Sequence, residues 1–157
     1  MKPPPRPRIL SGATYEYMTT CGKVYITVNS LYGTPVEVFV SMGKAGGCAA
    51  ATLESIARLV SKALRSGLDL TSTIRTMDSI SCRGSVIDRG VTVQSCPDAI
   101  AKALNEESKT AKATWEVVEQ LRQEPTSGKT EDTDKDGDKD KDKDGDKDKS
   151  RSGAKQR

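Results

Sequence analysis

The sequence predicts an α+β domain, in which a small antiparallel three-stranded meander is followed by three to four helices and then by a disordered charged tail. Three observations predict this class. Apolar and polar residues alternate in the first part of the chain, and apolar residues change to helical spacing after residue 50. Residues 125–157 contain almost no apolar side chain.

The composition limits what the chain can do. Its 157 residues are 34% hydrophobic, which suits one small domain with a polar extension. The formal net charge of +3 neither favours nor excludes a nucleic acid partner. Because the sequence contains no histidine, histidine bases, Ser-His or Cys-His nucleophile pairs and histidine metal sites are excluded.

Three segments joined by short turns are predicted to form the meander: residues 14–20, 23–30 and 36–42. Apolar residues occupy every second position in the second and third segments, as in half-buried strands. These positions are Val24, Ile26, Val28, Val36, Val38 and Val40.

The first predicted helix follows at residues 48–66, and its apolar residues fall on one stripe. They are Leu53, Ile56, Ala57, Val60 and Leu64. Gly67 stands where a C-terminal cap belongs, and Asp69 is placed to cap a shorter second helix.

Residues 81–95 are predicted to form a loop, with a short strand at residues 91–93. A third helix is expected to start at Ser95 or Cys96, because Pro97 suits the first turn of a helix. A last helix is expected to precede the tail, with a stripe of apolar residues that serves as core or as a docking face. That stripe is Ala111, Trp115, Val118 and Leu121.

These elements divide the chain into four parts: a proline-rich N-terminal arm (1–7), a folded domain (8–106), an appended helix (107–124) and a tail of alternating Asp and Lys (125–157). The tail is predicted to be disordered, because it has no large apolar residue to offset its ordering entropy. No apolar run resembles a signal peptide or a membrane span. We therefore expect a cytoplasmic protein without a membrane partner.

A glycine-rich loop, "SMGKAGGCAAA", lies between the third strand and the first helix. Lys44, Gly46 and Gly47 at a helix N-terminus are a candidate site for an anion or a nucleotide, since glycine amides, the helix dipole and one lysine all favour negative charge. The alternative is a tight corner, in which small residues let the helix pack closely on the sheet.

Four cysteines are the other candidates for chemistry. Cys21, Cys48, Cys82 and Cys96 form no CxxC pair, but each lies at a predicted turn, loop or helix start. A four-cysteine zinc site assembled from distant loops is one possibility. A redox pair of Cys48 and Cys96 is another, because a helix N-terminus favours the thiolate. The third is that all four are small, inert thiols.

The segments "TCGKVYITVN", "EVFVSMGKAGGCAAA" and "SCPDAIAKAL" together resemble the TSCPD domain. That family takes its name from a Thr-Ser-Cys-Pro-Asp motif, which here reads Gln94-Ser95-Cys96-Pro97-Asp98, with Gln in place of the first Thr. The resemblance covers about residues 6–106.

The resemblance implies a place in the ribonucleotide reductase system. The domain is found near the C-terminus of adenosylcobalamin-dependent (class II) ribonucleotide reductases, and also as a free-standing small protein. The expected partner is therefore a reductase catalytic chain, and adenosylcobalamin would be met only through that partner. The family label is ribonucleoside-diphosphate reductase, but a folded part of this size has no room for the catalytic barrel. A zinc-dependent interaction module and a nucleotide- or nucleic-acid-binding domain are the alternative functions.

Overall fold

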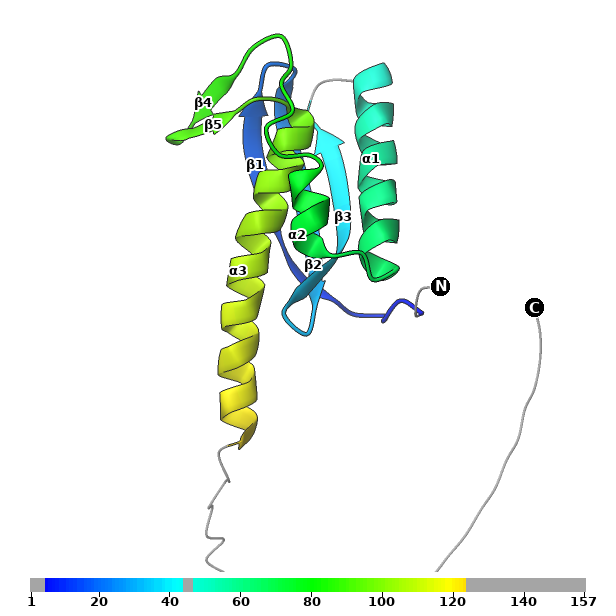
Figure 1. Ribbon diagram of the computed structural model, residues 1–157, viewed down its shortest axis with the longest axis vertical. Helices are drawn as coiled ribbons and strands as arrows, with labels where there is room; N and C mark the ends of the chain where they lie inside the picture. Colours follow the sequence, from blue (N-terminus) through cyan, green and yellow to red (C-terminus); the bar gives the residue numbers. More distant parts are fainter. Residues whose placement is uncertain (1–4, 44–46, 124–157) are drawn as a thin grey trace, which may run out of the picture. The chain divides into compact units, whose positions relative to one another are not determined.

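A three-stranded antiparallel sheet forms the first half of the fold. The computed structural model describes residues 5–43 and 47–123. β1 (Ser11–Thr19), β2 (Gly22–Leu31) and β3 (Thr34–Met42) pair in the order β1-β2-β3. The predicted meander and the α+β class are confirmed, and Figure 1 shows helices packed against the sheet.

The core lies between the sheet and the helices. Val24, Ile26 and Val28 of β2 have no exposed surface, as their alternation predicts. Each buried aliphatic side chain of this size stabilises the fold by about 1.5–3 kcal/mol. The buried helical residues of the same core cluster include Leu53, Ala57, Val60, Ala99, Ile100 and Leu104.

The turn between β2 and β3 also contacts a helix. Tyr32 and Gly33 have φ angles of 50° and 74°, the two positive values that a tight two-residue hairpin turn requires. A Cβ atom on Gly33 would lie 2.9 Å from the Cβ of Trp115. Gly33 therefore permits both the turn and the close approach of Trp115.

The first helix, α1 (Cys48–Arg65), ends as the sequence predicts. Gly67 has a φ of 86°, which glycine adopts without strain. The N–H of Leu68 donates to the carbonyl of Ala63 at 3.1 Å, and the N–H of Gly67 donates to the carbonyl of Leu64 at 3.0 Å. These are the two bonds of a Schellman cap, so the predicted C-terminal cap is confirmed.

Two side chains satisfy backbone groups that the regular elements leave unpaired. Asp69 caps α2 (Leu70–Arg75), since its carboxylate accepts from the N–H of Ser72 at 2.7 Å. At the edge of β3, the N–H of Val38 donates to the hydroxyl of Ser61 in α1 at 2.8 Å. This contact attaches α1 to the edge strand of the sheet.

A second hairpin stands where the sequence predicted a loop with one short strand. β4 (Val86–Asp88) and β5 (Val91–Val93) pair antiparallel. A two-residue turn joins them, and both of its residues, 89 and 90, have positive φ angles. The expectation missed β4, because Val86–Asp88 does not alternate apolar and polar residues as Val91–Val93 does. The carboxylate of Asp88 accepts from the N–H of Met18 at 2.8 Å, which ties the hairpin to β1.

The last helix is one element rather than two. α3 (Cys96–Gln123) runs for 28 residues, and its C-terminal half extends past the sheet in Figure 1. The prediction of two helices here was wrong, because residues 105–111 contain neither glycine nor proline to end the first. The described part of the chain thus has three helices, within the predicted number.

Some predictions fall outside the described residues. These are the Asp/Lys tail at 125–157, and Lys44 and Gly46 of the glycine loop. Across 5–43 and 47–123, no helix combines the length and the apolar character needed to cross a membrane.

Candidate functional site

Residues 95–98 form a compact start to α3. The hydroxyl of Ser95 accepts from the N–H of Asp98 at 3.2 Å, so Ser95 is the N-terminal cap. Cys96 begins the helix and Pro97 follows it in the first turn, as predicted. All of these except Pro97 are buried, which places the helix start inside the fold.

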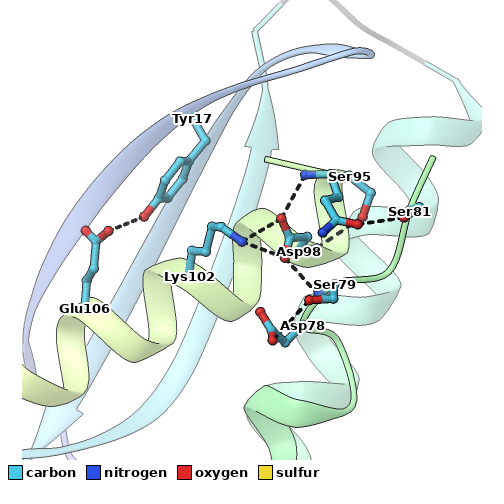
Figure 2. A network of polar contacts seen from close by, with 9 residues as sticks. Tyr17, Asp78, Ser79, Ser81, Ser95, Asp98, Lys102 and Glu106 are labelled. Carbon is cyan, nitrogen blue, oxygen red and sulfur yellow. Dashed lines mark hydrogen bonds and ion pairs between the residues drawn. The ribbon is translucent and has the colours of Figure 1, made fainter. Parts of the chain in front are cut away.

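Asp98 joins three separate segments (Figure 2). Its carboxylate has no exposed surface and accepts from the N–H of Ser79 at 3.0 Å and from the N–H of Gln94 at 2.8 Å. The ammonium group of Lys102, one turn later in α3, lies 2.7 Å from both carboxylate oxygens. One side chain thus holds the segment after α2, the end of β5 and the start of α3 together.

These contacts keep Asp98 ionised. Burial alone would raise the pKa of its carboxyl group, but the bonds from Lys102, Gln94 and Ser79 outweigh it, and the pKa lies below the ordinary value of 3.8. Because the carboxylate is buried and its oxygens are occupied by donors, it is poorly placed to act as a general base. We therefore assign it a structural role.

Cys96 packs against the β1–β2 turn. Its sulfur atom is buried and lies 3.4 Å from the hydroxyl oxygen of Thr19. That hydroxyl donates to the carbonyl of Gly22 at 2.9 Å and accepts from the N–H of Cys21 at 3.2 Å. Because the hydroxyl of Thr19 donates its only proton to the carbonyl of Gly22, the thiol of Cys96 is the donor to the Thr19 oxygen.

Cys82 lies beside the same turn. Its N–H donates to the carbonyl of Gln94 at 3.1 Å, and its side chain is exposed. The pKa of Cys82 is lowered, mainly by a hydrogen bond from the backbone N–H of Arg83 and then by the hydroxyl of Thr20. Its thiolate is therefore favoured.

Cys21 interacts with both of the other thiols. Its pKa is raised, mainly by electrostatic repulsion from Cys96 and then by partial burial and a hydrogen bond to Cys96. A hydrogen bond from Cys21 also contributes to the lowered pKa of Cys82. The pKa of Cys21 thus lies above its ordinary value, and the pKa of Cys82 lies below its own.

Cys48 takes no part in this group of thiols. The starts of α1 and α3, the β1–β2 turn and the segment before β4 all lie at the same end of the domain (Figure 1), as the cysteine hypothesis requires. Within the described ranges, Cys21 interacts with Cys96 and Cys82, whereas Cys48 does not act on Cys21 or Cys82. The redox pair of Cys48 and Cys96 stays a prediction.

The chain was compared with known proteins. It matches the family described as the TSCPD domain over residues 1–108. The chain belongs to the TSCPD domain family. No curated protein and no solved structure matches it.

In this TSCPD domain the name-giving motif has a structural explanation. Ser95 caps the helix, Cys96 packs on the β1–β2 turn, and Asp98 binds two backbone N–H groups and one ammonium group. The first motif position, Gln94, contacts Asp98 through its backbone N–H. A Gln can therefore replace the Thr of the family motif without losing this contact.

The sequence analysis missed a second buried carboxylate of the TSCPD domain. Glu107, only 4% exposed, accepts from the hydroxyl of Tyr15 at 2.9 Å and from that of Ser30 at 2.8 Å. Its neighbour Glu106 is exposed and accepts from the hydroxyl of Tyr17 at 2.8 Å (Figure 2). No local pattern identifies Glu107 as buried, because its two partners come from β1 and β2.

The described cavities of the TSCPD domain are open and of moderate size. One of about 490 Å³ lies between α2 and α3, one of about 400 Å³ between β3 and α1, and one of about 500 Å³ beside Tyr32 and Trp115. Such volumes suit small ligands.

Proposed function

We propose that this chain is an accessory domain of the ribonucleotide reductase system, which binds a class II reductase catalytic chain and does not catalyse the reduction itself. The observation that carries the proposal is the family match over residues 1–108. The TSCPD domain family is associated with ribonucleotide reductases.

The geometry supports a binding module more than an active site. The acid of the motif is buried and ion-paired, and the motif cysteine is buried against Thr19. Much of the C-terminal half of α3 is exposed: Val117 and Leu121 are 54% and 65% exposed. Exposed apolar side chains on a protruding helix suit contact with another protein.

The isolated chain is expected to give no deoxyribonucleotide from ribonucleoside diphosphates or triphosphates, even with adenosylcobalamin and a dithiol. The physical reason is that the described residues form a three-stranded sheet, a short hairpin and three helices, and not the large barrel that class II catalysis needs. Chromatographic quantification of deoxyribonucleotides checks this, with a complete class II reductase as positive control. Turnover above the cofactor-only background would contradict it.

Binding is the direct test of the proposal. A class II catalytic chain from which its own TSCPD domain has been removed is titrated with this chain in a calorimeter. We expect saturable binding, and weaker or no binding to the same catalytic chain with its TSCPD domain in place. Equal heats for both chains, or none for either, would contradict the proposed role.

Zinc binding and nucleotide binding stay predictions. Within the described residues, no group of three or more Cys, Asp and Glu side chains is arranged to hold a metal ion. For nucleotide binding, Gly47 has a φ of 72° and forms the start of α1 without a side-chain cap. Elemental analysis of the purified chain tests the first alternative, and titration with a nucleoside triphosphate tests the second.

A further inference from the structure

Three segments that are distant in sequence converge around the thiols. Cys21 lies in the β1–β2 turn, Cys82 in the segment before β4, and Cys96 at the start of α3. The hydroxyl of Thr19 contacts both the N–H of Cys21 and the sulfur of Cys96. The segment of Cys82 is held by its bond to Gln94, two residues before Cys96.

A second contact brings the Cys82 segment to the turn itself. A Cβ atom on Gly84 would lie 3.6 Å from the methyl carbon of Thr20, the residue next to Cys21. This is ordinary van der Waals contact, so the two backbone segments lie directly against each other. The two exposed cysteines, Cys21 and Cys82, thus lie on adjoining segments, and Thr19 connects the backbone of Cys21 with the buried sulfur of Cys96.

The surroundings of Cys82 leave room for a small reactant. It lines an open hollow of about 250 Å³ together with small and polar residues, and its sulfur is exposed. The residues that line the hollow with it are Ser81, Gly84, Ser85, Thr92 and Gln94.

We propose that Cys82 and Cys21 form a thiol–disulfide exchange site, in which Cys82 attacks a low-molecular-weight disulfide such as oxidised glutathione and Cys21 resolves the mixed disulfide. The site goes beyond the accessory role and does not depend on it. The thiol that attacks must be exposed and ionised, and the one that resolves must lie beside it. The lowered pKa of Cys82 and the raised pKa of Cys21 agree with this order.

The thiol–disulfide exchange takes two steps. The thiolate of Cys82 forms a bond to one sulfur of the small disulfide, whose S–S bond breaks, and the leaving thiolate takes a proton from water. Cys21 then gives its proton to solvent and attacks the sulfur of Cys82, which expels the second small thiolate. The small disulfide is reduced to two thiols, and Cys21 and Cys82 are oxidised to one disulfide.

The other two cysteines, Cys96 and Cys48, are not part of the proposed exchange site. Cys96 is only 8% exposed and donates to Thr19, so it is shielded from an attacking reagent. Cys48 is exposed at a helix start, and among the described residues it acts on neither Cys21 nor Cys82. Cys48 is therefore a matched control, with exposure but without a resolving partner.

The test treats the reduced full chain with oxidised glutathione in the presence of a chelator, followed by acid quench, alkylation and peptide mapping by mass spectrometry. We expect a Cys21–Cys82 disulfide in the wild-type chain and in Cys48→Ser. Cys21→Ser should instead accumulate glutathione on Cys82. In Cys82→Ser, glutathione should attach to Cys21 at least about tenfold more slowly than it attaches to Cys82 in Cys21→Ser.

Three outcomes would overturn the proposal: a disulfide that joins any other pair, glutathione attached to Cys48 as fast as to Cys82, or no intramolecular disulfide at all. Circular dichroism of both serine variants checks that they fold. Because both positions are exposed, we expect them to melt like the wild type.

Discussion

Replacing Asp98 with alanine is expected to lower the free energy of unfolding by about 3–5 kcal/mol, which is the usual cost of removing one partner from a buried ion pair. The change leaves the ammonium of Lys102 and the backbone N–H groups of Ser79 and Gln94 without their acceptor. Such a loss corresponds to a fall in the melting temperature of about 10–20 °C for a domain of this size. Thermal and urea denaturation measure it.

The Lys102→Met variant is the matched control for Asp98. The side chain of Lys102 is 21% exposed, and Asp98 keeps both backbone donors when the ammonium is removed. We therefore expect Lys102→Met to cost clearly less than Asp98→Ala. An equal or smaller cost for Asp98→Ala would show that the carboxylate does not hold the three segments together.

The pH dependence gives an independent readout for Asp98. Its folded-state pKa is depressed, so its contribution to stability is fully present above the ordinary value of 3.8. The contribution is lost as the pH falls from that value through the lower folded-state pKa. The free energy of unfolding of the wild type should therefore fall more steeply below about pH 4 than that of Asp98→Asn.

The second large effect is expected at Glu107. Glu107→Ala should cost about 2–4 kcal/mol, because it removes a buried acceptor from two hydroxyl groups and leaves a cavity. Glu106→Ala is the matched control: it also removes an acceptor from a tyrosine, but at an exposed position where water can replace it. We expect less than about 1 kcal/mol there. Equal costs would contradict the buried role of Glu107.

The pKa of Tyr15 gives a second measure of its contact with Glu107. Burial raises its pKa from 10.0 to about 12, with the hydrogen bond to Glu107 as the next cause. The neutral phenol is thus favoured in the folded state, so this stabilisation is full below pH 10.0 and is lost as the pH rises toward about 12. In Glu107→Ala the pKa of Tyr15 should shift back toward its ordinary value, as measured by phenolate absorbance against a Tyr15→Phe reference.

Local patterns were sufficient for most of the secondary structure. The alternation of Val24, Ile26 and Val28 and the caps at Gly67 and Asp69 depend on neighbours in sequence, and the structure confirms them. The errors in the predicted secondary structure also concern local features, namely one short strand and one helix boundary. β4 lacks the alternation of apolar and polar residues that β5 has, and a separate last helix was expected where helix-forming residues continue α3.

The candidate site was predictable only in part. Each cysteine was correctly placed at a turn, loop or helix start, because glycine, proline and capping residues mark such positions in sequence. Which of them meet was not predictable. The grouping of Cys21 and Cys82 depends on how the segment before β4 docks against β1, and that docking uses single contacts such as the one between Asp88 and Met18.

The sequence by itself determined the α+β class, the meander, the helix caps and the family, because these are carried by periodicity, capping chemistry and a motif within short stretches of chain. Only the tertiary structure decided that Asp98 and Glu107 are buried carboxylates and that Cys21 interacts with Cys82 and Cys96. The physical reason is that burial and proximity are properties of contacts between distant segments. The type of a residue shows only whether it can be buried or close to another residue. The packing of α3 against β1 and β2 decides which residues are buried and which meet.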